Sequence, residues 1–234
     1  MNTQSIEPIV QLKNVSKIYQ QGKIDVKAVD DFSLEINKGE FAALCGPSGS
    51  GKTSVLNLIG GLDVPNDGEV WVDQINLATL NASELSKVRK NRIGFVFQSY
   101  NLIPVMTAYE NAEFVLNLQG VKEAECRERV MAILKEVGLE GLENRRPDEM
   151  SGGQQQRVAI ARAIVTQPAI ILADEPTANV DSHTAASLLD LMQQLNQDKD
   201  MTFLFSTHDQ HVMDRAKRLI HLIDGKLDED ELRE

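Results

Sequence analysis

The sequence has 234 residues, of which 42% are hydrophobic and 25% charged, a composition typical of a globular protein that buries a core. Its formal net charge of −11 disfavours non-specific binding to nucleic acids and anionic lipids, because both carry negative charge. No apolar run approaches the roughly 20 residues that span a bilayer, and the first residues lack the features of a signal peptide. We therefore expect a cytoplasmic protein that does not bind nucleic acid.

The first part of the chain has the residue pattern of short strands separated by turns. The expected strands are 9–19, 26–36, 41–45 and 70–73. From about Leu85 the pattern becomes helical, with a strand-like interruption at 93–97. Two further helices are expected at 108–118 and 122–137. This central helical region predicts a subdomain beside the main sheet.

After Ser151, helices and strands alternate. The expected elements are a helix to about Val165, a strand at 169–174, a helix at 182–195, a strand at 201–207, a short helix and a strand at 218–224. Such alternation predicts a mostly parallel sheet with helices on its faces. We expect the acidic segment 227–234 to be a solvated tail.

The segment Gly46–Thr53, GPSGSGKT, matches the phosphate-binding pattern G-x-x-x-x-G-K-[ST] and lies between an expected strand and an expected helix. Its backbone N–H groups and the helix N-terminus are suited to phosphate oxygens. Lys52 is expected to reach the β- and γ-phosphates of a nucleotide, and the Thr53 hydroxyl to bind Mg²⁺. The expected nucleotide-binding residues of this loop are Gly46, Pro47, Ser48, Gly49, Ser50, Gly51, Lys52, Thr53 and Ser54.

Two acids follow the apolar strand 169–173, before Pro176 ends it. Asp174 is suited to hold the metal ion, and Glu175 is suited to polarise the attacking water. These two motifs occur in kinases, GTPases and many ATPases, so they do not name a reaction by themselves. A GTPase would be expected to carry N-K-x-D, and the nearest string, NKGE at Asn37, ends in the wrong residue and precedes the phosphate loop.

The segment Met150–Arg157, MSGGQQQR, places a serine hydroxyl and unhindered glycine amides at the start of a helix, which favours anion binding. Because the phosphate loop already binds one nucleotide, this second site indicates contact with the nucleotide of another chain. Taken together, the motifs resemble those of the ATP-binding-cassette ATPases, whose signature is Leu-Ser-Gly-Gly-Gln. Met150 replaces the leucine with a side chain of similar size.

The resemblance covers nearly the whole chain, and it implies one nucleotide-binding domain over residues 1–234. It implies an α/β fold: a P-loop NTPase core with a mostly parallel sheet, an N-terminal antiparallel β subdomain and a helical signature subdomain near 99–165. It also implies hydrolysis of ATP with Mg²⁺ in a homodimer. The residues expected to contact the ATP of the partner chain are Ser151, Gly152, Gly153 and Gln154.

The resemblance assigns three further residues near the nucleotide. Tyr19 resembles the aromatic residue that stacks on adenine, with a core tyrosine as the alternative. Gln98 resembles the Q-loop glutamine that contacts Mg²⁺ and water and links to the transport partner. His208 resembles the switch histidine that contacts the γ-phosphate, so the expected catalytic residues are Glu175, His208 and Lys52.

Asp181 resembles the D-loop aspartate at the seam between the two copies. The family more often has Gly-Asn-Leu-Asp or Gly-Ala-Leu-Asp in this loop, so Ala178 and Val180 depart from the pattern. Loss of the glycine is expected to change the flexibility of the loop.

Four stretches resemble one branch of the family, the ATPases of macrolide exporters, lipoprotein-release systems and a related cell-division complex. They are residues 46–53, 95–104, 150–164 and 171–182. This resemblance implies an integral membrane permease as partner, docked near residues 99–118, and a location on the inner face of the cell membrane. Core packing is the alternative role for the apolar residues of this stretch. The main alternative is a soluble cassette ATPase without a permease, although neither a coiled-coil insertion nor a second cassette is visible. The signature helix argues against a small-molecule P-loop kinase, and the complete set of expected catalytic residues argues against a binding module without activity.

Overall fold

The structure is a computed structural model that describes residues 7–22 and 24–233. Its strands are β1 Val10–Gln21, β2 Ile24–Ile36, β3 Phe41–Cys45, β4 Asp67–Val72, β5 Ile75–Asn76, β6 Ile93–Phe97, β7 Ile170–Asp174, β8 Phe203–Thr207, β9 Arg218–Ile223 and β10 Lys226–Leu232. Its helices are α1 Lys52–Ile59, α2 Ala82–Arg92, α3 Ala108–Gln119, α4 Glu123–Glu136, α5 Gly152–Ile164, α6 Ser182–Lys199 and α7 Gln210–Arg215. Short 3₁₀ turns span Leu77–Thr79 and Pro147–Glu149.

The strands form two sheets. The four-stranded sheet has the order β2-β1-β4-β5 and its pairings are antiparallel. The six-stranded sheet has the order β10-β9-β3-β8-β7-β6, with parallel pairing from β9 through β6. The expected α/β class, with an antiparallel N-terminal sheet and a mostly parallel second sheet, is therefore confirmed.

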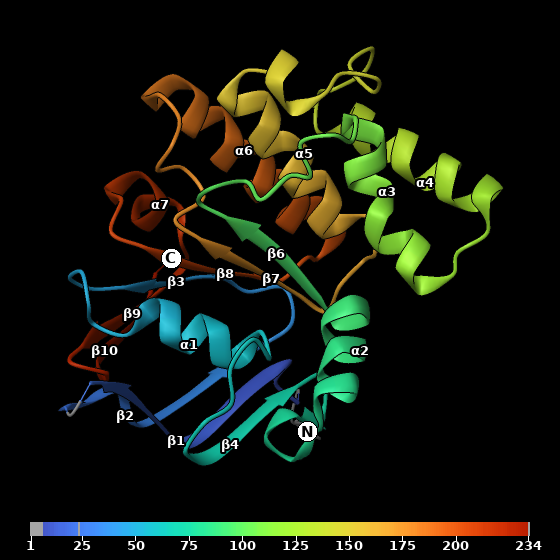
Figure 1. Ribbon diagram of the computed structural model, residues 1–234. Helices are drawn as coiled ribbons and strands as arrows, with labels where there is room; N and C mark the ends of the chain where they lie inside the picture. Colours follow the sequence, from blue (N-terminus) through green and yellow to red (C-terminus); the bar gives the residue numbers. More distant parts are fainter. Residues whose placement is uncertain (1–6, 23, 234) are drawn as a thin grey trace, which may run out of the picture.

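Both faces of the central strands β3, β7 and β8 of the six-stranded sheet are buried. Alternate residues of β3 belong to different apolar clusters, because successive side chains of a strand point to opposite faces. Ala42 and Leu44 pack with α1 and the four-stranded sheet, whereas Phe41, Ala43 and Cys45 pack with the helices of the other face. Figure 1 shows α1 between the two sheets and α3 to α6 above the six-stranded sheet. In the part of the chain described, no helix combines the length and apolarity needed to cross a membrane.

The acidic C-terminal segment is not a solvated tail, and that expectation was wrong. Residues 227–232 of this segment belong to β10, which pairs antiparallel with β9 across a turn at Asp224 and Gly225, both with positive φ. Glu234 lies outside the described residues. The pairing is supported by Arg218, whose guanidinium lies 2.7 Å from Asp230 and 2.8 Å from Glu40. The side chains of β10 are exposed on both faces of the strand, so its acidic composition does not prevent its backbone from pairing with β9.

A buried asparagine holds the segment between β6 and α3. The Asn111 side-chain oxygen accepts from the Ile103 N–H at 2.8 Å, and its amide donates to the carbonyl oxygens of Ile103 and Met106 at 3.2 and 3.1 Å. Asn111→Leu is expected to lower the free energy of unfolding by about 1–3 kcal/mol, since buried backbone groups lose their partners. Urea denaturation measures this change. Equal destabilisation by Asn117→Leu, at an exposed position of α3, would contradict the interpretation.

Candidate active site

The phosphate loop connects the buried strand β3 to α1. Gly51 caps α1 with φ of 103°, and a Cβ at this position would lie 2.3 Å from the carbonyl oxygen of Ala28, so only glycine fits. Lys52 begins the helix with its side chain folded back across the loop. Its Nζ donates to the carbonyl oxygens of Gly46 and Pro47 at 2.8 and 2.9 Å, which fixes the ammonium group at the mouth of the loop.

The end of β7 lies beside the start of α1, because only β8 separates β7 from β3 in the sheet. The Thr53 hydroxyl is 3.3 Å from each carboxylate oxygen of Asp174. The described residues contain no cluster of three or more His, Cys, Asp or Glu side chains able to hold a metal ion. One hydroxyl and one carboxylate nevertheless fit Mg²⁺, which prefers oxygen ligands and keeps waters and substrate phosphates in its shell.

Glu175 and His208 are brought into direct contact. The Glu175 Oε1 and His208 Nδ1 atoms lie 2.6 Å apart, and Oε2 is 3.4 Å from the Thr207 hydroxyl. Glu175 has φ of 47°, a region that side-chain-bearing residues seldom adopt and that the surroundings must enforce. Its side chain is 17% exposed, whereas that of His208 is 73% exposed.

A cavity of about 700 Å³ opens over these groups. The phosphate-loop residues that line it are Pro47, Ser48, Gly49, Gly51, Lys52, Thr53 and Ser54. Gln98, Glu175 and His208 also line it, as do Ala28 and Ser206, which the sequence analysis did not single out. The Ser206 hydroxyl is buried without a hydrogen-bond partner among the described residues. In the parts of the chain that the structure describes, this lining includes neither Gly46, Ser50 or Asp174 nor any signature residue.

The signature segment begins α5 with a capping box. The Ser151 hydroxyl accepts from the Gln154 N–H at 3.3 Å, and the Gln154 side chain accepts from the Ser151 N–H at 3.0 Å. The two glycines also permit close packing. A Cβ on Gly152 would lie 2.8 Å from the Tyr100 hydroxyl, and one on Gly153 would lie 2.3 Å from a Thr184 methyl carbon.

Residues 29–178 match the family model described as ABC transporter. The chain belongs to the ABC transporter family.

Similar proteins extend over almost all of this cassette. The ABC transporter ATP-binding protein MJ0796 of Methanocaldococcus jannaschii is 44% identical over 227 residues, covering 95% of this chain and 97% of the relative. The lipoprotein-releasing system ATP-binding protein LolD of Alcanivorax borkumensis is 41% identical over 94% of this chain and 96% of the relative. The macrolide export ATP-binding/permease protein MacB of Brucella melitensis is 42% identical over 94% of this chain but 34% of the relative.

A solved structure shares the fold. The dimeric post-hydrolysis state of MJ0796, bound to ADP and Pi, matches with a TM-score of 0.89 at 44% identity, covering 96% of this chain and 99% of that one. The present chain is therefore a nucleotide-binding ABC ATPase, and its resemblance to the export and lipoprotein-release branch is confirmed.

In this ABC cassette, Tyr19 lies on β1 with its hydroxyl fixed. The hydroxyl donates to Asp63 Oδ2 at 2.9 Å, and Lys17 Nζ binds the other carboxylate oxygen at 2.6 Å. The Lys17 ammonium is also 5.1 Å from the centre of the Tyr19 ring. Partial burial raises the pKa of Tyr19, and the neighbouring Asp63 carboxylate adds to the rise. Tyr19 is not among the described residues that line the nucleotide cavity.

Asp181 has a local structural role that the sequence analysis missed. Asp181 caps α6, accepting from the Thr184 hydroxyl at 2.6 Å and from the backbone N–H groups of His183 and Thr184 at 3.1 and 3.0 Å. These hydrogen bonds, that of the Thr184 hydroxyl foremost, lower the pKa of Asp181. An aspartate directly before an expected helix was the signal that could have revealed the cap.

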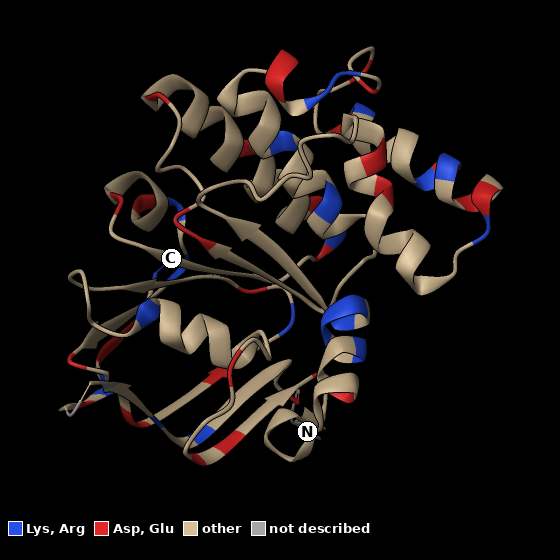
Figure 2. Ribbon diagram, in the orientation of Figure 1, with Lys and Arg blue, Asp and Glu red and all other residues tan. Residues whose placement is uncertain are grey.

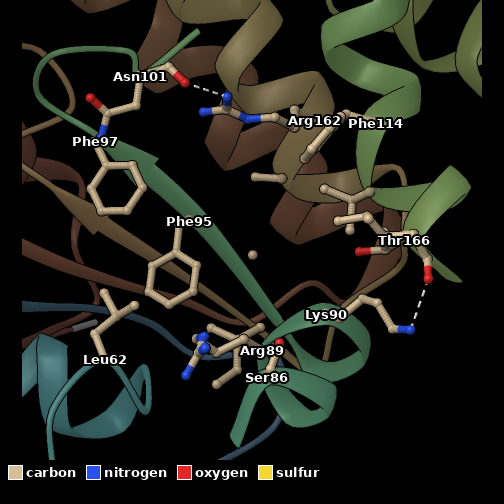
Figure 3. A pocket seen from close by; sticks show the side chains of 15 residues that line it. Leu62, Ser86, Arg89, Lys90, Phe95, Phe97, Asn101, Phe114, Arg162 and Thr166 are labelled. Atoms are coloured by element: carbon tan, nitrogen blue, oxygen red, sulfur yellow. Dashed lines mark hydrogen bonds between the residues drawn. The ribbon is translucent and has the colours of Figure 1, made fainter. Parts of the chain in front are cut away.

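A second cavity, about 370 Å³, lies where β6 meets α2, α3 and α5 of the cassette (Figure 3). Its walls are largely apolar. Phe95 and Phe97 of β6 stack with ring centres 5.5 Å apart, and Phe114 of α3 faces the same groove. Leu118, at the end of α3, is 56% exposed there. We call this site the β6 groove.

The charge of the β6 groove is opposite to that of the whole chain. Its described lining contains Arg89, Lys90 and Arg162 but no acidic residue, and none of the three forms an ion pair with a described residue. The basic last turn of α2 is visible in Figure 2. Although the net charge of the whole chain is −11, this local excess of cations favours an acidic partner segment at the groove.

Proposed function

We propose that the chain is the ATP-hydrolysing subunit of a membrane transporter, working as a homodimer around two Mg·ATP. Each ATP is bound by the phosphate loop of one copy and the signature segment of the other. Two observations support this arrangement. The described signature residues do not line the nucleotide cavity of their own chain, and the related MJ0796 is dimeric in its solved structures.

The proposed chemistry assigns one task to each side chain. Lys52 and the signature amides stabilise charge that develops on the phosphates, and Glu175 orients the attacking water. His208 contacts the γ-phosphate and, through its 2.6 Å contact, holds the Glu175 carboxylate. Thr53, Asp174 and Gln98 would hold Mg²⁺, which neutralises charge on the phosphate oxygens when bound.

We assign the remaining predicted residues to positions around this centre. Tyr19 stacks on adenine, and Asp181 lies at the seam between the copies. The chain acts as one nucleotide-binding domain over residues 1–234, with residues 99–165 as its helical part. Closure of the dimer on ATP, followed by hydrolysis and reopening, is the movement passed to the transporter.

The proposed partner is an integral membrane permease that holds the ATPase at the inner face of the membrane. The β6 groove supports this proposal, because it joins exposed apolar side chains to three cations that form no ion pair with any residue the structure describes. A permease segment that fits is a short helix with an apolar face and an acidic residue. The names of the relatives LolD and MacB, which refer to lipoprotein release and macrolide export, support the same class of partner.

Affinity capture from detergent-solubilised native membranes tests the partner. Tagged Glu175→Gln, with Mg·ATP, is expected to retain an integral membrane protein. Recovery of soluble or ribosomal proteins alone would favour the alternative, an ABC ATPase that works without a permease.

A substitution in the β6 groove tests whether the captured partner binds there. Leu118→Glu is expected to abolish retention of the membrane protein, since it places a negative charge among these apolar side chains and opposes an acidic partner segment. Met131→Glu introduces the same charge at an exposed apolar position of α4 outside the groove, and it is expected to retain the partner. Equal retention by the two variants would show that the partner does not bind in the groove.

A further inference from the structure

Two loops of the nucleotide site exchange hydrogen bonds within one chain. The Tyr100 hydroxyl donates to the Asn179 carbonyl oxygen at 3.0 Å, and the Asn179 side-chain amide donates to the Gln98 carbonyl oxygen at 2.8 Å. Each loop thus supplies one side-chain donor and one backbone acceptor. We call this reciprocal pair the Tyr100–Asn179 latch.

Arg162 holds the backbone on the Tyr100 side of the latch. Tyr100 and Asn101 have φ of 54° and 50°, a conformation that persists only where the surroundings impose it. Arg162 of α5 imposes it by donating to the carbonyl oxygens of Tyr100 and Asn101 at 2.8 and 2.5 Å. Arg162 and Asn101 also line the β6 groove, and Figure 3 shows their contact there. The groove and the latch therefore share a rigid support.

The latch also contacts the signature segment. A Cβ on Gly152 would lie 2.8 Å from the Tyr100 hydroxyl and 3.5 Å from the Asn179 carbonyl oxygen, so both partners of the latch pack on this glycine. A tyrosine hydroxyl is protonated at neutral pH and can donate, and partial burial raises the pKa of Tyr100 further. Tyr100, which belongs to the same loop as Gln98, therefore contacts both the loop of Asp181 and the start of α5.

We propose that the Tyr100–Asn179 latch makes these three segments move as one unit, so that Gln98, Asp181 and Gly152 are presented together to the two ATP molecules of the dimer. Tyr100 and Asn179 do not themselves contact the reacting atoms, which makes them positioning residues. The inference rests on the proposed dimeric function and adds a link between the β6 groove and the seam between copies. Without the latch, Gln98 and the D-loop would be ordered separately when ATP is bound.

The first test compares Tyr100→Phe, Asn179→Ala and the double variant, each made in Glu175→Gln. Light scattering measures the Mg·ATP concentration at half-maximal dimerisation. Each single change is expected to raise it about 2- to 12-fold, the range for loss of a typical hydrogen bond. The double variant is expected to need the same Mg·ATP concentration as the single variant that dimerises less readily, because the two bonds act as one unit. Tyr109→Phe, at a half-buried tyrosine of α3 outside the latch, is the matched control.

The second test uses the monomer. Hydrogen exchange of residues 98–107 and 177–182 is expected to accelerate in both segments for either single variant, with the affinity for fluorescent ATP unchanged and the melting temperature lowered by only a few degrees, as for the loss of one hydrogen bond. If each hydrogen bond ordered only its own loop, exchange would accelerate only in the substituted loop, and that result would overturn the proposal. Additive effects in the double variant, or dimerisation at the parent's Mg·ATP concentration, would also overturn it. Failure of Glu175→Gln itself to dimerise would instead contradict the proposed function, while the exchange measurement still decides on the latch.

Discussion

Replacing Glu175 with glutamine is expected to lower kcat for ATP hydrolysis by about 10²- to 10⁴-fold, the usual contribution of a positioned general base. Glutamine keeps the size of the side chain but cannot accept the proton of the attacking water. Binding of Mg·ATP is expected to persist, because Lys52, Thr53 and Asp174 are unchanged. Phosphate release at saturating Mg·ATP measures the loss of kcat.

The same variant is expected to accumulate as a dimer when Mg·ATP is present, since hydrolysis no longer releases the partner. Light scattering with and without Mg·ATP detects the change in mass. Glu128→Gln, which makes the same change at an exposed position of α4, is expected to hydrolyse ATP at the normal rate. A monomer at saturating Mg·ATP would contradict the shared site between copies, and a normal kcat would remove Glu175 from its role.

Lys52→Ala is expected to weaken Mg·ATP binding by about 10- to 150-fold, which corresponds to the ~1.5–3 kcal/mol of hydrogen bonds to a charged group. The ammonium group is already aimed across the loop by the carbonyl oxygens of Gly46 and Pro47, so little ordering is needed when phosphate binds. A titration with a fluorescent ATP analogue measures the affinity.

Because Lys52 is buried, the melting temperature of Lys52→Ala must be measured as well. Lys87→Ala removes an exposed lysine of α2 and is expected to leave both quantities unchanged. Unchanged affinity in a folded Lys52→Ala variant would remove the phosphate loop from ATP binding.

The phosphate loop and the order of elements could be predicted because their signals are local. The pattern Gly46–Thr53 specifies a backbone path directly, and the apolar strand before Asp174 specifies a buried central strand. Parallel strands then bring their carboxyl ends to one edge, which places Thr53 near Asp174 across 121 positions of sequence. No assumption about side-chain packing was required.

The β6 groove and the Tyr100–Asn179 latch could not be predicted, because each depends on side chains from separate elements. The latch joins positions 79 residues apart, and neither residue type signals the contact. A second reason for glycine at position 152 was also missed. The sequence analysis explained this glycine by the access of its amide to phosphate, and the structure adds its close contact with Tyr100. The strand β10 was missed because its acidic composition suggested a tail, whereas the turn before it directs its pairing with β9.

The placement of β10 also bears on how the chain behaves when concentrated. An unpaired outer strand can recruit a strand from another molecule and extend the sheet, a common start of aggregation. Here that strand carries four consecutive acids, residues 228–231. Asp230 pairs with Arg218 and Glu231 pairs with Arg233, whereas Asp228 and Glu229 form no ion pair with a described residue, so a second β10 alongside would bring like charges close together. The electrostatic repulsion protects the edge from uncontrolled polymerisation at low ionic strength, and salt would weaken that protection.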